Sequence, residues 1–104
     1  MIDISGMNFD KEVLKEGNLV VADFWASWCN PCKMLGVVLE EVSGEMGSKV
    51  KFVKINVEEN PQLAQRFNVK NLPTLMVFNK GELKDVVTGF KPKQDIEKFI
   101  QKNL

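Results

Sequence analysis

The chain contains 104 residues, of which 44% are hydrophobic and 27% charged, and its 14 basic and 14 acidic side chains give a formal net charge of zero. This length and composition are typical of a globular protein, so we expect a single domain over residues 1–104. The balanced charge argues against nucleic acid or an anionic membrane as a partner, and no apolar run is long enough to span a bilayer.

The N-terminal residues Met1–Ser5 lack the basic cluster and apolar run of a secretory signal. We therefore expect a cytoplasmic, reducing setting, and we expect a monomer. In such a setting a lone cysteine pair is more often catalytic or metal-binding than structural.

Two short elements are predicted before residue 19. The alternation of apolar and polar residues at positions 2–5 indicates a brief strand. Asn8 is a suitable N-cap for a short helix that ends near Gly17. Phe9 and Val13 would share the buried face of this helix, and its expected role is packing.

Residues 19–25 are almost continuously apolar, as in a central strand that is covered on both faces. Asp23 interrupts this run. A carboxylate in a buried strand is costly unless it is paired or protonated, and desolvation raises its pKa. Asp23 is therefore either a solvent-facing residue at a strand end or a proton acceptor near Cys32.

The strand runs into the segment Trp25–Lys33, which contains the only two cysteines and opens a helical pattern. Cys29 and Cys32 lie three residues apart and would share one helical face, close enough for a disulfide that can open and close. Cys29 would lie at the helix start, where unpaired amides and the dipole favour a negative charge by about 0.5 to 2 kcal/mol. We predict that Cys29 is the nucleophile and that Cys32 resolves the mixed disulfide. Pro31 suits the first turn because it has no amide hydrogen to leave unpaired.

Two other interpretations of the cysteine pair are a metal site and a structural disulfide. Zinc usually takes four ligands, and the chain has no histidine and no further cysteine, so we expect no metal site within it. A structural disulfide that closes so short a loop would add little stability. Redox chemistry is the interpretation that remains.

The next helix and strand show clear periodicity. From Met34 onward the apolar residues recur at helical spacing, which predicts a helix that faces the core through Leu35, Val38, Leu39, Val42 and Met46. Residues 50–57 alternate as in a strand, with one face formed by Val53, Ile55 and Val57 and the other by Val50, Phe52 and Lys54. Lys54 interrupts an apolar face. Considered alone, it would be a lysine whose apolar stem packs on this face and whose ammonium group extends to the surface.

A further helix is predicted to begin at Asn60 and Pro61, as cap and first residue. Its inward face would consist of Leu63, Ala64 and Phe67. Up to this point strands alternate with helices, which predicts parallel βαβ units.

The last part of the chain predicts an antiparallel hairpin and a helix. Residues 75–78 and 83–88 read as two strands joined by a turn at Asn79–Glu82, and Gly89 ends the second strand. Pro73 precedes the first strand, a position typical of a strand edge. The final helix opens at Pro92 and would bury Ile96, Phe99, Ile100 and Leu104.

The segment Asp23-Phe24-Trp25-Ala26-Ser27-Trp28-Cys29-Asn30-Pro31-Cys32-Lys33 resembles the active-site segment of the thioredoxin family. The resemblance continues through Leu72-Pro73-Thr74 and Gly89, so it covers nearly the whole chain. It implies an α/β thioredoxin fold, with a central mixed β-sheet of about five strands and about four helices on its two faces.

The resemblance also implies roles for residues outside the cysteine pair. Asp23 would accept a proton from Cys32, with Lys54 electrostatically coupled to it. The peptide bond before Pro73 would be cis, with Pro73 facing the cysteines. The substrate would lie against a patch formed by Trp28, Asn30, Pro31, Leu72, Pro73, Gly89 and Phe90.

Three residues differ from the usual family pattern. Asn30 stands where most members have glycine, and it could either donate a hydrogen bond to the Cys29 sulfur or remain in solvent. Val37, after Gly36, replaces a proline that commonly kinks the helix, so any kink would have to come from the glycine. Phe90 replaces a residue that is often smaller, which would make the docking surface bulkier.

These features predict a general protein disulfide reductase, which a thioredoxin reductase returns to the dithiol form. No nucleotide-binding fingerprint occurs, so we expect no bound cofactor and expect that partner to supply electrons. One alternative is a disulfide oxidase or isomerase, although no histidine lies between the cysteines. The other is a non-enzymatic thioredoxin-like module that binds a partner through the apolar patch.

Overall fold

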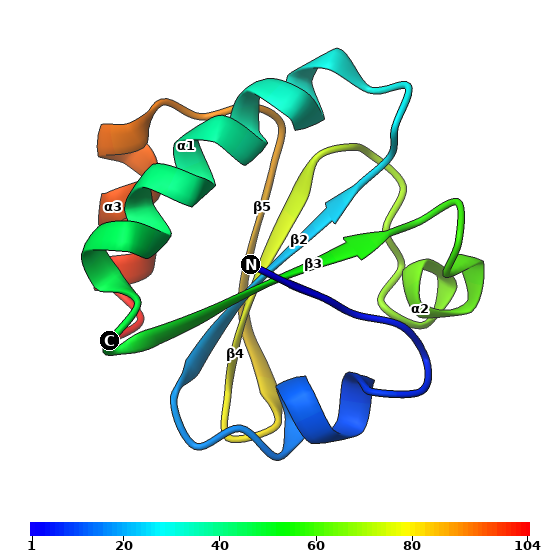
Figure 1. The fold of residues 1–104 in the computed structure, drawn as a ribbon, viewed down its shortest axis with the longest axis horizontal. Coiled ribbons are helices and arrows are strands. Elements are labelled where there is room, and N and C mark those ends of the chain that lie inside the picture. Colours follow the sequence, from blue (N-terminus) through cyan, green and yellow to red (C-terminus); the bar gives the residue numbers. More distant parts are fainter.

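The computed structural model describes residues 1–104 as one mixed sheet of five strands with four helical segments (Figure 1). In chain order the elements are β1 (Ile2–Asp3), η1 (Asp10–Leu14), β2 (Leu19–Trp25), α1 (Asn30–Met46), β3 (Val50–Asn56), α2 (Pro61–Arg66), β4 (Thr74–Asn79), β5 (Glu82–Thr88) and α3 (Lys93–Gln101). The predicted fold class is therefore confirmed. None of the helices is both long and apolar enough to cross a bilayer.

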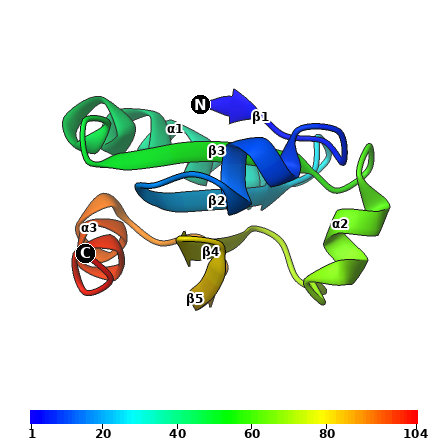
Figure 2. The ribbon, with the colours of Figure 1, turned by 90° about the horizontal axis from the view of Figure 1, so that it is seen from below.

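The strands are ordered β1-β3-β2-β4-β5, and Figure 2 shows this order from top to bottom. Strands β1, β3 and β2 are parallel, whereas β4 runs antiparallel to both β2 and β5. The connection from β1 to β2 and the connection from β2 to β3 cross the sheet in opposite directions. Because such crossovers are right-handed, η1 and α1 cover opposite faces.

The buried apolar residues form one core on each face of the sheet. The first joins the sheet to α1 and α3 through Leu19, Val21, Leu35, Leu39, Val42, Val50, Phe52, Leu75, Val77, Ile96, Phe99 and Ile100. The second joins it to η1 and α2 through Ile4, Phe9, Val13, Val20, Ala22, Phe24, Val53, Ile55, Leu63, Met76 and Phe78. Neighbouring residues of β2 therefore point to opposite cores, as expected for a strand that is buried on both sides.

Of the two predicted helix caps, Asn8 is wrong, since Phe9 precedes η1, whereas Asn60 is the N-cap residue of α2 but makes no side-chain capping bond. The Asn8 side chain accepts a hydrogen bond from the Ser5 N–H at 2.7 Å instead of capping η1, which is a π-helix that ends at Leu14 rather than near Gly17. The Asn60 side chain donates to the backbone carbonyls of two earlier residues and caps no amide of α2. The Asn60 side chain therefore ties the end of β3 to the residue after β1, whereas the Asn8 side chain binds backbone groups at the end of β1 only. Pro61 is the first residue of α2, as predicted.

The β4–β5 turn requires a glycine. Asn79 pairs with Glu82, and the two residues between them, Lys80 and Gly81, have φ angles of +51° and +85°. A Cβ atom at Gly81 would lie 3.0 Å from the Leu14 carbonyl oxygen, so both the backbone conformation and the close approach favour glycine.

The predicted burial of Leu104 is wrong, because α3 ends at Gln101 and Leu104 is exposed. Helix α1 is continuous from Asn30 to Met46, and a Cβ atom at Gly36 would contact nothing within 4 Å. Packing therefore does not require a glycine at this position.

Candidate active site

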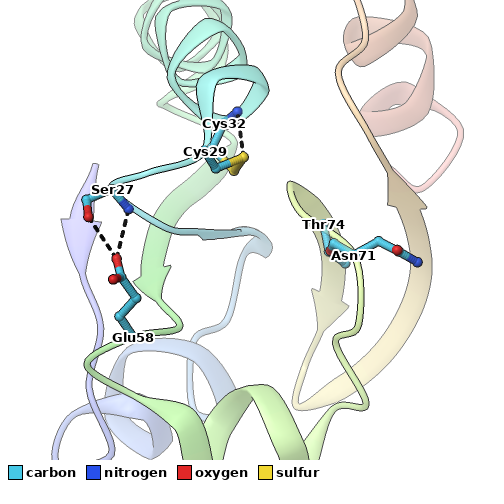
Figure 3. Close-up of a disulfide and its surroundings, with 6 residues drawn as sticks. All are labelled: Ser27, Cys29, Cys32, Glu58, Asn71 and Thr74. Carbon is cyan, nitrogen blue, oxygen red and sulfur yellow. Dashed lines mark hydrogen bonds between the residues drawn. A yellow bond between two sulfur atoms is a disulfide. The ribbon is translucent and has the colours of Figure 1, made fainter.

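The two cysteines lie at the start of α1 and form a disulfide with a Cα–Cα distance of 5.3 Å (Figure 3). Cys29 is the N-cap residue of α1, and its Sγ accepts a hydrogen bond from the Cys32 N–H at 3.2 Å. Pro31 lies in the first turn, where an amide hydrogen would have no partner. When the disulfide opens, the same amide and the helix dipole favour a thiolate at Cys29.

The two cysteines line different cavities. Neither cysteine is openly exposed, since the exposed fractions are 5% for Cys29 and 3% for Cys32. Cys29 lines a cavity of about 970 Å³, here called the Cys29 cavity, between the start of α1 and residues 57–72. Cys32 lines a separate cavity of about 320 Å³, here called the Cys32 cavity, together with Asp23 and Lys54. A substrate and a proton can therefore reach the pair from different directions.

The loop before Cys29 is held by a carboxylate from another part of the chain. The Cys29 N–H donates to the Ala26 carbonyl at 3.2 Å and closes a turn. Glu58 accepts hydrogen bonds from the Ser27 N–H at 3.0 Å and from the Ser27 hydroxyl at 2.8 Å (Figure 3). Glu58 carries no local sequence signal for this role, because it lies 31 residues from Ser27 and only the pairing of β2 with β3 brings the two together.

The segment at residues 71–74 faces the disulfide from the other side (Figure 3). The Leu72–Pro73 peptide bond is cis, as the resemblance implied. The Thr74 hydroxyl donates to the Asn71 carbonyl at 2.5 Å, and the Gly89 N–H donates to the Pro73 carbonyl at 2.8 Å. Leu72 packs against the cluster of Ala26, Cys29 and Cys32, but its own N–H and C=O form no hydrogen bond within the chain. Its backbone is therefore free to pair with an extended segment.

Asp23 is buried in β2, which excludes the solvent-facing strand end, one of the two alternatives considered for this residue. Burial raises the pKa of Asp23 from 3.8 to about 7, although the positive charge of Lys54 acts to lower it. One oxygen of the carboxyl group, Oδ1, has no hydrogen-bond partner. Asp23 and Cys32 line the same cavity, which leaves the carboxyl group able to exchange a proton near neutral pH.

Lys54 pairs in register with Asp23 on the adjacent strand β3. Its ammonium group lies 3.8 Å from an Asp3 oxygen and 5.2 Å from the centre of the Trp25 ring. The coupling of Lys54 with Asp23 stays a prediction: the positive charge of Lys54 acts to lower the pKa of Asp23, while the ion pair itself is made with Asp3.

Comparisons with known proteins agree over nearly the full length. The family model described as Thioredoxin matches residues 1–102. The chain is 44% identical over 104 residues to thioredoxin from Staphylococcus saprophyticus, covering 100% of this chain and 98% of the relative. It is 49% identical over 86 residues to thioredoxin from Bacillus subtilis, covering 83% of each chain, and 39% identical over 102 residues to thioredoxin from Rickettsia bellii, covering 98% and 97%. The chain belongs to the thioredoxin family.

Membership of the thioredoxin family confirms the predicted chemistry. Cys29 and Cys32 are the redox-active pair, and the protein is a protein disulfide reductase. Asn30 is exposed, and the hydrogen bond to the Cys29 sulfur comes from the Cys32 N–H and not from the Asn30 side chain. Of the two arrangements considered for Asn30, the disulfide form therefore has the one in solvent.

The structure brings only part of the predicted substrate patch together. Trp28 is exposed at the rim, and it lines the Cys29 cavity with Asn30, Pro31 and Leu72. Pro73 is buried behind this surface, and neither Gly89 nor Phe90 lines the cavity. Phe90 is half-buried against the core formed by α1 and α3, because the chain turns from β5 toward α3 at this point.

Proposed function

We propose that this thioredoxin-family protein is a general disulfide reductase of the cytoplasm, active as a single-domain monomer, with Cys29 as nucleophile and Cys32 as resolving thiol. One observation carries the proposal. The Cys29 sulfur lies at the N-cap of α1 and accepts the Cys32 N–H, and Cys29 lines a cavity large enough for a peptide segment. Cys32 lies one turn further along the helix, in the cavity that contains Asp23.

The reaction consists of two exchanges. The Cys29 thiolate attacks one sulfur of the target disulfide, so that a Cys29–substrate bond forms and the other substrate sulfur leaves as a thiolate, which takes a proton. The Asp23 carboxylate then removes the proton of Cys32. The Cys32 thiolate attacks the Cys29 sulfur, forming the Cys29–Cys32 disulfide and releasing the second substrate sulfur as a thiolate, which takes a proton. Two electrons pass from the protein to the substrate.

Recognition would depend mainly on the substrate backbone. An extended segment beside the Cys29 cavity can exchange hydrogen bonds with the free N–H and C=O of Leu72, as an added strand does. Such bonds do not depend on the substrate side chains. Trp28, Asn30 and Pro31 supply the surrounding contact surface, while the contacts proposed for Pro73, Gly89 and Phe90 require the substrate to extend beyond the cavity.

The disulfide form must be reduced again after each cycle. We propose a thioredoxin reductase as the partner, because the relatives over the whole chain are thioredoxins. Its electrons would enter through the same Cys29 sulfur that contacts substrate, since Cys29 lines the larger cavity and Cys32 the smaller one beside Asp23.

An insulin-disulfide reduction assay tests the assignment of the two thiols. We expect Cys29→Ser and Cys32→Ser each to abolish turnover. Only Cys32→Ser should accumulate a mixed disulfide with insulin, because its nucleophile remains. Activity equal to the native chain in Cys29→Ser would favour a binding module, and accumulation in Cys29→Ser alone would reverse the two roles. Equilibration with glutathione that left the native chain mainly in the dithiol form would favour the oxidase alternative, because glutathione reduces a strongly oxidising disulfide.

A further inference from the structure

Three charged residues form a row across three adjacent strands. Asp3 of β1 pairs in register with Lys54 of β3, and Lys54 pairs in register with Asp23 of β2. Register partners on neighbouring parallel strands lie about 4.8 Å apart and point to the same face. The sheet therefore aligns a carboxylate, an ammonium group and a second carboxyl group on the face that α1 covers.

The two acidic ends of the row have opposite surroundings. The Asp3 side chain is 82% exposed, whereas Asp23 is only 3% exposed. The Lys54 ammonium lies 3.8 Å from the Asp3 carboxylate and over the Trp25 ring, at the outer end of the row. At the inner end, Asp23 Oδ1 has no hydrogen-bond partner. Lys54 is thus held by the exposed carboxylate and not by the buried one.

Few other charges face Asp23. Helix α1 contributes Lys33, Glu40 and the disulfide-bonded Cys32 to the Cys32 cavity, and the amino group of Met1 lies 3.7 Å from Glu40. On β4 the register partner of Asp23 is Leu75, which carries no charge. Within the sheet, Lys54 is therefore the one cation beside Asp23, and Asp3 is the one carboxylate that pairs with it.

We propose that Asp3 is a positioning residue, which keeps the Lys54 ammonium away from Asp23 and thereby sets the pH at which Asp23 can take the proton of Cys32. Two effects act in the same direction. Asp3 competes for the cation that would otherwise favour the ionised form of Asp23, and its own negative charge disfavours that form. The inference depends on the role proposed above for Asp23 as the proton acceptor.

The titration of Asp23 in the oxidised full-length chain tests the positioning directly, by NMR of the carboxyl carbon. Asp3→Asn should lower the midpoint of Asp23, and by only about 0.2 to 0.7 pH units because exposed ion pairs are weak. Lys54→Met should raise the midpoint, because it removes the cation that favours the ionised carboxyl group. In the Lys54→Met background, Asp3→Asn should shift the midpoint of Asp23 by less than half as much, because Asp3 then has no Lys54 ammonium to hold. Asp10→Asn, at an exposed acid on η1, is the matched control and should leave the midpoint unchanged.

Unchanged or raised midpoints in Asp3→Asn would overturn the proposal. An equal shift with and without Lys54 would also overturn it, because Asp3 would then act through its field and not through the lysine. The pH profile of mixed-disulfide resolution separates this inference from the proposed function. If the Asp23 midpoint moves as expected but the profile does not follow it, the proton-acceptor role of Asp23 fails while the positioning of Lys54 is supported.

Discussion

At the scale of single residues, the carboxyl group of Asp23 links folding to pH. The folded state holds its pKa at about 7, above the ordinary value of 3.8. Between these two pH values the folded chain binds more protons than the unfolded chain. The stabilising contribution is therefore greatest at acidic pH and is lost as the pH rises toward 7.

We predict that Asp23→Asn removes this pH dependence. The native chain should lose about 4 kcal/mol of unfolding free energy relative to the variant between pH 4 and pH 8, because the difference in pKa is about three units. Guanidinium denaturation of both oxidised proteins across this range measures the difference. If the unfolding free energies of the two proteins differed by the same amount at every pH, Asp23 would not titrate with a raised pKa in the folded state.

At the scale of elements, the active site depends on two loops that meet from distant parts of the chain. The loop after β2 carries Trp28 and the loop after β3 carries Glu58, and the carboxylate of Glu58 joins them through Ser27. The neighbouring Val57 N–H also donates to the Trp25 carbonyl at 2.9 Å. These bonds hold Trp28 at the rim of the Cys29 cavity.

We predict that Glu58→Ala raises the KM for insulin about fivefold, because the loss of about 1 kcal/mol of hydrogen bonding releases the loop that carries Trp28. The rate with a small aromatic disulfide should stay native, since that reagent needs only the sulfur. Glu58→Gln keeps an acceptor oxygen, so its KM for insulin should lie between those of the native chain and the Glu58→Ala variant. The matched control is Glu59→Ala, whose side chain is exposed and forms no ion pair. Equal KM values in the Glu58→Ala and Glu59→Ala variants would refute the role of the bond.

At the scale of the whole molecule, α3 supports the helix on which the cysteines lie. Ile96, Phe99 and Ile100 of α3 complete the core that α1 and the sheet share. Lys93 also bridges Glu41 at 2.9 Å and Glu45 at 2.5 Å, in the second half of α1. Figure 1 shows α3 beside this half, away from the cysteine end.

We predict that Ile96→Ala destabilises the protein by about 3 kcal/mol, because Ile96 is fully buried and its truncation leaves a cavity. The alkylation rate of Cys29 in the folded, reduced protein should remain native, since the contact lies far along α1. Thermal unfolding and iodoacetamide kinetics measure the two quantities. Gln94→Ala, at an exposed position of the same helix, should change stability by less than about 0.5 kcal/mol. A large change in alkylation rate would mean that α3 tunes the site.

Features set by near neighbours could be predicted from the sequence. The helical spacing of Leu35, Leu39 and Val42 and the alternation in residues 50–57 identify their buried faces. Cys29 becomes an N-cap because Pro31 and the apolar stripe start the helix directly after it. Each of these outcomes depends on backbone geometry over a few residues, so the local pattern is sufficient.

Features set by contacts between distant segments were decided only by the tertiary structure. The bond between Ser27 and Glu58 and the row of Asp3, Lys54 and Asp23 depend on strand register, which the packing of both cores determines. The side chains of Asn8 and Asn60 bind backbone groups where strands end and not the helix amides that the local sequence suggested. The sequence by itself therefore determined the redox pair and its helix, whereas the fold decided which charges and loops surround that pair, because those neighbours meet only when the sheet has formed.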